Sequence, residues 1–216
     1  MTNQDGVFEF NAALKERIVD HLGGHDRRAI DHGDRKRAAV AVVVVESDGA
    51  AAFVLCRRAA RMNRHSFLWA LPGGRFDDGE DAIDAARREL HEELGVELPA
   101  DAVLGLLDDY ATRSGYVITP VVLWGAKPDH DGPLEFTPAP DEVHAVYRVG
   151  LDELCRPDSP RFVSIPESDR PVVQIPILDH LIHAPTAAVL VQFRWLALEG
   201  NPDPVADFEQ PVFAWK

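Results

Sequence analysis

Cysteine is scarce in this sequence, with only Cys56 and Cys155 among 216 residues. Two widely separated cysteines form neither a disulfide framework nor a zinc-binding motif, so they predict a reducing environment. Long apolar runs are also lacking, because the longest, residues 38–45, is far too short to cross a bilayer. No basic segment followed by an apolar one begins at Met1. Together these absences predict a cytoplasmic protein without a membrane partner.

The second shortage is positive charge. Lys and Arg number 22 against 36 Asp and Glu, which gives a formal net charge of -14 and a pI near 5.0. Nucleic acids and anionic membrane surfaces both attract basic proteins. The balance therefore predicts that nucleic acid is not a partner, and that a phosphate-bearing ligand needs local compensation by metal ions or arginines.

The length and pattern indicate one main domain with two extensions. A chain of 216 residues can bury one sizeable core, and no internal repeat marks a second one. We expect an N-terminal helix and linker over residues 1–37, the main domain over 38–200 and a C-terminal tail over 201–216. The tail is rich in proline and aromatic residues, which predicts that it docks on its own domain or on the partner subunit of a homodimer.

The most informative stretch is residues 71–96, LPGGRFDDGEDAIDAARRELHEELGV. Its glycine turn leads into an acidic segment, which favours a helix N-terminus. Apolar residues then recur at helical spacing, at Ile83, Ala86, Leu90 and Leu94. Gly95 is typical of a residue that ends a helix. The stretch therefore predicts a turn followed by a helix with one apolar face.

Three carboxylates share a neighbouring face of this helix: Glu89, Glu92 and Glu93. Like charges at this spacing repel one another by about a few tenths of a kcal/mol per exposed pair, which a bound cation would remove. Oxygen ligands without a nearby His or Cys suit Mg²⁺ or Mn²⁺ better than zinc. The bare turn at Gly73 and Gly74 also lets a backbone group approach a metal or a phosphate. The alternative is a solvated acidic face on a surface helix.

The spacing of these residues resembles the Nudix box. Nine positions over 23 residues carry the resemblance: Gly74, Glu80, Arg88, Glu89, Leu90, Glu92, Glu93, Gly95 and Val96. It implies that Glu89, Glu92 and Glu93 bind divalent cations with a carbonyl of the Gly74 turn. It also implies that Arg88 orients Glu89, since a guanidinium can hold a carboxylate through two parallel hydrogen bonds. Glu80 would then act structurally or outside the metal's direct ligands.

The resemblance also implies a reaction. Nudix enzymes cleave a nucleoside diphosphate linked to another group, by attack of water on one phosphorus while cations neutralise the developing charge. In several of them a loop glutamate outside the box completes the metal site or acts as general base, and Glu142 follows a Pro-rich loop here. The alternative for Glu142 is a solvated loop residue. A non-catalytic nucleotide sensor and an enzyme that removes damaged nucleotides are further alternatives.

The flanking sequence predicts an α/β fold. Strands are expected over residues 38–45, 51–57, 103–110, 116–125, 145–149 and 172–177, and further helices over 8–22 and 185–198. Pro120 implies an edge position or a bulge in its strand, and residues 157–170 are expected to be irregular. The Nudix resemblance implies the more specific architecture, an α/β/α sandwich with a mixed β-sheet.

Two groups of arginines lie where a phosphate ligand could use them. Arg57, Arg58, Arg61 and Arg64 precede the glycine turn, and we expect at least one to contact the substrate, the alternative being a solvated loop. Linker residues 25–36 and their neighbour Arg37 supply a second group. For Arg27, Arg28, Arg35 and Arg37 the favoured prediction is solvated linker charge, with substrate contact as the alternative.

A second resemblance concerns the substrate. The segment VLCRRAARMNRHSFLWALPGG is similar to the upstream signature of coenzyme A diphosphatases, as are SGYVITPVV, APDEVHAVYRV and PTAAVL further along. Arg58 and the Pro-Gly-Gly turn stand where that signature expects them. The expected serine, second arginine and glycine are replaced by Ala59, Asn63 and Phe67. Coenzyme A or an acyl-CoA is therefore one candidate substrate, and ADP-ribose, NADH and other nucleotide derivatives are the alternatives.

Overall fold

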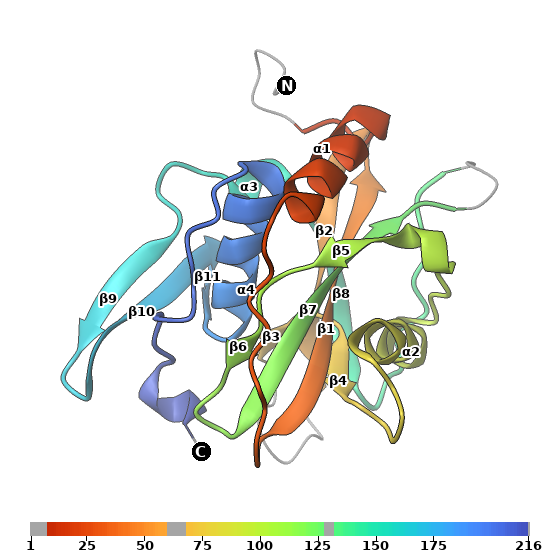
Figure 1. Ribbon diagram of the computed structural model, residues 1–216. Helices are drawn as coiled ribbons and strands as arrows, with labels where there is room; N and C mark the ends of the chain where they lie inside the picture. The colour runs from red at the N-terminus through yellow and green to blue at the C-terminus, as the bar shows by residue number, and fades with distance from the viewer. Residues whose placement is uncertain (1–7, 60–67, 128–131, 216) are drawn as a thin grey trace.

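The computed structural model describes residues 8–59, 68–127 and 132–215 of the chain (Figure 1). Its helical elements are α1 (Ala12–Gly23), α2 (Ala82–Leu94), η1 (Ala100–Ala102), α3 (Leu151–Leu154), α4 (Thr186–Gln192), η2 (Phe193–Leu198) and η3 (Val212–Ala214). Its strands are β1 (Lys36–Ser47), β2 (Ala50–Arg58), β3 (Trp69–Ala70), β4 (Gly73–Arg75), β5 (Val103–Leu106), β6 (Tyr110–Ala111), β7 (Tyr116–Gly125), β8 (Val143–Gly150), β9 (Arg161–Ile165), β10 (Ser168–Ile177) and β11 (His180–His183). The predicted helices over 8–22 and 185–198 are present as α1 and as α4 with its continuation η2.

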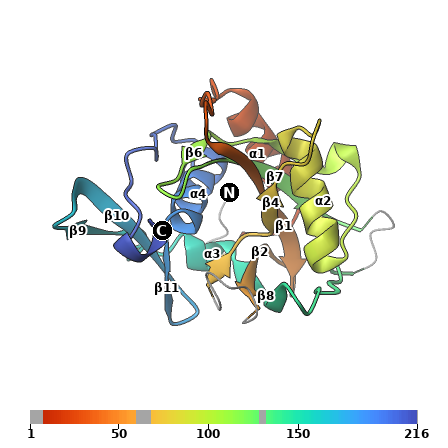
Figure 2. The same cartoon turned by 90° about the horizontal axis from the view of Figure 1, so that it is seen from below.

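The strands β1 to β8 form one mixed sheet with helices on both faces. β1 runs parallel to β7 and antiparallel to β2, as the predicted hairpin requires. Alternate residues of β1 enter different cores, because side chains of a strand point to opposite faces. Val43 packs in the core that contains Leu90 of α2, whereas Val42 packs in the core that contains Ile18 of α1 and Leu190 of α4. Figure 2 shows α2 and α4 on opposite sides of the sheet, so the predicted α/β/α sandwich is confirmed.

A gap between β1 and β2 holds the glycine turn. The two strands pair directly only near their hairpin, from Val44 with Phe53 onward. Beyond this point β4 pairs with β1, β3 pairs with β2, and the Ala41 amide donates to the Pro72 carbonyl at 2.8 Å. The turn is therefore wedged into the sheet instead of standing on a surface loop.

Of the two alternatives expected for Pro120, an edge position or a bulge, the edge position is wrong. β7 lies between β1 on one side and β5 and β6 on the other. Pro120 is paired in register with Val40 of β1, and on its other side it faces the interval between β5 and β6. That interruption removes the need for an amide donor at Pro120, although the Leu107 amide still donates to its carbonyl at 3.0 Å.

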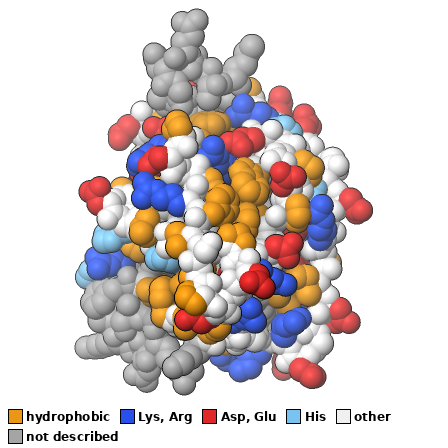
Figure 3. All heavy atoms as spheres, turned by 90° about the vertical axis from the view of Figure 1, so that its left-hand side faces the viewer, with side chains coloured by type: hydrophobic (Ala, Val, Ile, Leu, Met, Phe, Trp, Pro, Cys, Tyr) orange, Lys and Arg blue, Asp and Glu red, His pale blue; other side chains and the backbone are white. Residues whose placement is uncertain are grey.

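A second sheet was not predicted in full. β9, β10 and β11 form an antiparallel three-stranded sheet, so residues 161–165, within the segment expected to be irregular, are a strand. Nearly all of β9 is exposed, and an exposed strand lacks the apolar alternation from which strands are recognised. Figure 3 shows apolar side chains gathered on this side of the molecule, and Phe162 and Phe213 are among the exposed ones. An exposed apolar surface is compatible with a partner subunit, but the homodimer remains a prediction.

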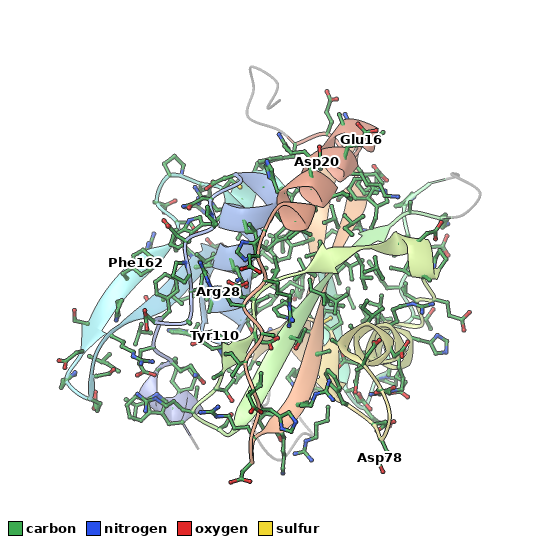
Figure 4. The ribbon with its side chains drawn as sticks, in the orientation of Figure 1. Glu16, Asp20, Arg28, Asp78, Tyr110 and Phe162 are labelled. Atoms are coloured by element: carbon green, nitrogen blue, oxygen red, sulfur yellow. The ribbon has the colours of Figure 1, made fainter. Side chains whose placement is uncertain are left out.

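The prediction of solvated linker charge is wrong at Arg27, which is half-buried, whereas Arg28 is exposed as expected but also forms an ion pair. Arg27 forms an ion pair with Asp109, and Arg28 donates to Asp108 at 3.2 Å through its side chain. Both aspartates are buried, and Thr119 also donates to Asp109 at 2.6 Å. Figure 4 shows Arg28 on the segment that runs along the outside of the sheet. Buried carboxylates need partners, so these arginines attach the linker to the domain.

The C-terminal tail docks on its own domain. The Tyr110 hydroxyl donates to the Phe208 carbonyl at 2.8 Å. Arg113 donates to both carboxylate oxygens of Glu209, at 3.2 and 2.6 Å, and Ser168 donates to Glu209 at 2.8 Å.

The division of the chain into a main domain and two extensions, at residues 37 and 200, remains a prediction. Within the described ranges, no helix combines the length and the apolar character needed to cross a membrane.

We predict that Glu209→Gln destabilises the fold in a pH-dependent way. Hydrogen bonds from Arg113, with the Gln210 amide and Ser168, lower the pKa of Glu209 from its ordinary value of 4.5 to about 2. The ionised carboxylate therefore stabilises the folded state above pH 4.5, and this contribution disappears as the pH falls toward 2. We expect a loss of about 2 kcal/mol at pH 7 in urea unfolding, shrinking toward zero near pH 2.

Glu16→Gln is the matched control, because Glu16 is an exposed carboxylate on α1 (Figure 4). It should change the free energy of unfolding by less than about 0.5 kcal/mol. An equal loss for Glu209→Gln at pH 7 and pH 2 would contradict the assignment.

Candidate active site

The helix α2 begins and ends as the sequence predicts. The Asp81 side chain caps its N-terminus by accepting from the amides of Ile83 and Asp84, at 2.8 and 2.9 Å. Gly95 ends it in the left-handed conformation, with φ at 68°, which glycine adopts without strain. Ala86, Leu90 and Leu94 are buried against the sheet. This packing fixes the rotation of α2 and turns Glu89 and Glu93 toward the glycine turn.

Two adjacent glycines allow the turn to approach α2. A Cβ on Gly74 would overlap the Glu89 carboxylate, and a Cβ on Gly73 would overlap the backbone of Ala39 and lie 2.7 Å from the Val40 Cα. Gly73 has φ at +154°, in the region that favours glycine. Its amide donates to Glu93 Oε2 at 3.0 Å. The turn therefore contacts two of the predicted metal ligands.

Arg88 connects the carboxylates at the start of the site. Its Nη1 donates to Glu89 Oε1 and to Glu92 Oε2, both at 2.9 Å. Its two parallel bonds go to Glu80, from Nε at 2.7 Å and from Nη2 at 3.1 Å, and not to Glu89. Nη2 also donates to the Arg75 carbonyl at 2.8 Å. Glu80 thus anchors the guanidinium, and the anchored guanidinium holds Glu89.

Glu93 is a buried carboxylate with incomplete compensation. Only 5 % of the residue is exposed, and the nearest Arg58 nitrogen is 3.9 Å from its Oε1. Burial raises the pKa of Glu93 to about 7, against the Gly73 amide and Arg58, which lower it. Glu89 and Glu142 raise it further. The site has more negative charge than its own residues neutralise.

Glu89 and Glu142 belong to the same electrostatic group. Burial raises the pKa of Glu89, Arg88 lowers it, and Glu92 and Glu142 raise it again. Glu142 precedes β8, where its carbonyl accepts from the Ala59 amide at 2.8 Å, and its side chain is exposed. The structure therefore brings Glu142 close enough to Glu89 and Glu93 to affect their ionisation.

The donor set fits a hard divalent cation. Within the described ranges, no three His, Cys, Asp or Glu side chains converge at metal-binding distances, because Arg88 holds Glu89 and Glu92 while the Gly73 amide holds Glu93. The candidate ligands are carboxylates, two of them have raised pKa values, and the Glu89 carboxylate lies directly against the bare Gly74 backbone. Excess negative charge among oxygen donors is the property that Mg²⁺ and Mn²⁺ sites share.

The upstream arginines are placed only in part. Arg57 and Arg58 lie at the end of β2 and are half-buried, and Arg58 faces Glu93. Arg61 and Arg64, like Asn63 and Phe67, lie outside the described residues. The proximity of Arg58 to Glu93 was missed from the sequence, since it depends on β2 ending beside the glycine turn.

Comparison with known proteins identifies the family. The profile of the NUDIX domain family matches residues 35–168. The chain belongs to the NUDIX domain family. A Caenorhabditis elegans relative described as Nudix hydrolase 3 is 29% identical over 153 residues, which is 68% of this chain and 63% of the relative. A Cronobacter sakazakii relative described as an uncharacterized Nudix hydrolase, NudL, is 36% identical over 124 residues, 57% of this chain and 62% of the relative.

The Nudix chain therefore spans less than two thirds of the length of these relatives. Among solved structures, a MutT/nudix family protein from Enterococcus faecalis aligns with a TM-score of 0.54. It is 13% identical, and the alignment covers 89% of this chain and 77% of that one. This likeness supports the Nudix fold.

We predict that alanine at Gly74 abolishes cation binding, whereas alanine at Gly73 destabilises the fold. Gly74→Ala pushes aside the flexible end of the Glu89 side chain, so it should change stability by less than about 1 kcal/mol while abolishing divalent-cation binding at this site. Gly73→Ala meets backbone atoms at a positive φ, so it should cost about 2–3 kcal/mol or more. Urea unfolding and Mn²⁺ titration measure the two effects.

Gly23→Ala is the control, since a Cβ at Gly23 meets no atom within 4 Å. It should alter neither property. Equal destabilisation by Gly73→Ala and Gly74→Ala would contradict the geometry of the turn.

Proposed function

We propose that this Nudix protein is a hydrolase that cleaves the diphosphate bond of a nucleoside diphosphate derivative with the help of Mg²⁺ or Mn²⁺. The observation that carries the proposal is the placement of Glu89. Gly74 leaves space for it, and Arg88 donates to it at 2.9 Å. Glu142 raises the pKa of Glu89, and Glu89 in turn raises the pKa of Glu93. In the alternative, a surface helix with a solvated acidic face, the carboxylate would extend into solvent and would not be held against a glycine turn.

Glu89, Glu92, Glu93 and the Gly74 carbonyl would hold the divalent ions. Bound cations supply neutralisation of the charge that develops on the diphosphate oxygens and lower the pKa of water. The residues of the chain have separate tasks. Arg88 keeps the Glu89 side chain in one orientation because Glu80 fixes the guanidinium from its other side. Arg58 offsets the negative charge around Glu93.

The proton of the attacking water needs a carboxylate acceptor. Glu89 and Glu142 are the two candidates, because both lie in the electrostatic group around Glu93. Glu89 is held in place by Arg88, whereas Glu142 stands at an exposed turn before β8. The structure supports either assignment, and substitution distinguishes them.

We predict that Glu89→Gln and Glu142→Gln separate the general base from its neighbour. The amide has nearly the same size but cannot take up a proton, so loss of the base should lower kcat by about 10²–10⁴. The other substitution should have a smaller effect on kcat, with any loss of cation affinity measured by Mn²⁺ titration. Urea unfolding should show changes below about 1 kcal/mol for both.

Glu97→Gln provides the control, because Glu97 is an exposed carboxylate just beyond α2. It should leave kcat within about twofold of the parent. If neither Glu89→Gln nor Glu142→Gln lowers kcat, the proposed site is not where hydrolysis takes place.

Coenzyme A or an acyl-CoA is the leading candidate for the substrate. The support is the likeness of the segments around Arg58, the glycine turn and residues 114–122 to coenzyme A diphosphatases. ADP-ribose, NADH and other nucleotides remain the alternatives, since Ala59, Asn63 and Phe67 depart from that signature. An enzyme that removes damaged nucleotides would catalyse the same hydrolysis and would differ only in the nucleotide that it binds.

We predict Mg²⁺- or Mn²⁺-dependent turnover of at least one member of a panel of coenzyme A, ADP-ribose, NADH, dinucleoside polyphosphates and nucleoside triphosphates. Phosphorus-31 NMR identifies the bond that is cleaved, and chelation with EDTA should abolish turnover. Fast turnover of another member with none of coenzyme A would exclude the coenzyme A assignment. Tight metal-dependent binding without cleavage of any member would favour the sensor over the enzyme.

A further inference from the structure

A shallow basic hollow lies beside the candidate active site. It has a volume of about 590 Å³ and lies where the linker enters β1 and where β4 leads into the loop before α2. Five of its lining residues are basic: His32, Arg35, Lys36, Arg37 and Arg75. This concentration stands out in a chain with a net charge of -14. Three lining residues are acidic, Asp77, Asp78 and Glu80, but a cluster of cations on an acidic protein still indicates an anionic ligand.

Four cations of the hollow form no ion pair with any residue that the structure describes. Among the described residues, no carboxylate forms a salt bridge with Arg35, Lys36, Arg37 or Arg75. Arg27 and Arg28, a few residues earlier, are paired with buried aspartates. The structure thus divides the linker arginines into a pair that stabilises the fold and a pair left available to a ligand.

Aromatic residues hold two of the guanidinium groups in place. The Arg37 guanidinium lies 4.1 Å from the centre of the Phe76 ring, and that of Arg75 lies 5.4 Å from the Tyr116 ring. Arg75 Nε also donates to the Tyr116 hydroxyl at 2.9 Å. Stacking restricts the side chains while leaving most of their donors free of carboxylates. Arginines fixed in this way lose little further freedom when they bind an anion.

The acidic residues of the hollow do not cancel this charge. Glu80 accepts two hydrogen bonds from Arg88, and Asp77 lies 3.6 Å from the same guanidinium. Figure 4 shows Asp78 at the outer tip of the loop between β4 and α2, directed away from the sheet. The basic side of the hollow therefore faces solvent with an excess of positive charge.

The hollow and the candidate active site share a wall. Arg88 donates to Glu80, which lines the hollow, and to Glu89, which lies in the site, at 2.7 and 2.9 Å. The same guanidinium donates to the Arg75 carbonyl. Gly74, which contacts Glu89, directly precedes Arg75. One extended ligand can therefore reach both places.

We infer that the basic hollow formed by His32, Arg35, Lys36, Arg37 and Arg75 binds a phosphomonoester of the substrate, at a position separate from the diphosphate that is cleaved. The inference rests on the proposed function and narrows its substrate class to nucleoside diphosphate derivatives that carry a further phosphate. A phosphomonoester is favoured over a carboxylate because its two charges and three oxygens match several guanidinium and ammonium donors at once.

The test uses substrate pairs that differ by one phosphomonoester: coenzyme A against 3′-dephospho-coenzyme A, and NADPH against NADH. We expect the double variant R35Q/K36Q to lower kcat/KM at least about tenfold for the phosphorylated member, mainly through KM, and less than about threefold for the other. Both side chains are exposed, so the fold should be retained, which circular dichroism and thermal melting verify.

The double variant K15Q/R170Q is the matched control. It removes the same charge from α1 and from the second sheet and should affect both members of each pair by less than about twofold. An equal loss for both members in R35Q/K36Q, or no loss at all, would overturn the inference.

A binding experiment separates this inference from the proposed function. Titration calorimetry of each substrate pair in EDTA requires no hydrolysis. Tighter binding of the phosphorylated member by the parent protein, with the difference lost in R35Q/K36Q, supports the hollow even if no substrate is cleaved. Equal binding of both members by the parent protein overturns it even if the protein is an active hydrolase.

Discussion

The close approach of a bare backbone turn to the carboxylates of α2 is the constraint on which the site depends. Gly74 leaves the volume that Glu89 occupies, and the Gly73 amide satisfies one oxygen of Glu93. This approach requires β1 and β2 to separate beyond their hairpin, so that β3 and β4 enter between them. The sheet thus positions the turn, and the packing of Leu90 and Leu94 positions the helix that faces it.

Two buried carboxylates, one in the fold and one in the candidate active site, have pKa values shifted in opposite directions. Glu209 and Glu93 are 2 % and 5 % exposed. Arg113, with Gln210 and Ser168, fully engages Glu209 and lowers its pKa to about 2, whereas burial and neighbouring carboxylates raise that of Glu93 to about 7. Burial is the largest cause of the raised pKa of Glu93, whereas at Glu209 the hydrogen bonds from Arg113 outweigh it. The supply of positive charge differs as well, because Arg113 donates directly to Glu209, whereas the Arg58 guanidinium lies 3.9 Å from Glu93. The proposed divalent cation would supply positive charge beside Glu93.

The sequence predicts the centre of this molecule better than its periphery. The box from Gly74 to Val96 combines a turn, a capped helix and a periodic apolar face, and these local signals agree with one another. The edge assignment of Pro120 was wrong because the interruption between β5 and β6 is a property of the neighbouring strands. β9 was missed because its side chains are exposed. The pairing of Arg27 with Asp109 joins residues 82 positions apart, a separation that no local pattern reveals.

The arginines likewise divide into those that stabilise the fold and those that lie at the candidate site. Arg27, Arg28 and Arg113 meet carboxylates that the fold buries, so their charge is consumed in stabilising the chain. Arg88 connects the carboxylates of α2 with Glu80, an acidic residue in the wall of the basic hollow. On the proposed function, an anion would enter the basic hollow without a metal, but would approach Glu89 and Glu93 only together with cations. In the proposed scheme the protein alone would hold the remote phosphate of the substrate, and the diphosphate would be engaged only when the metal is present.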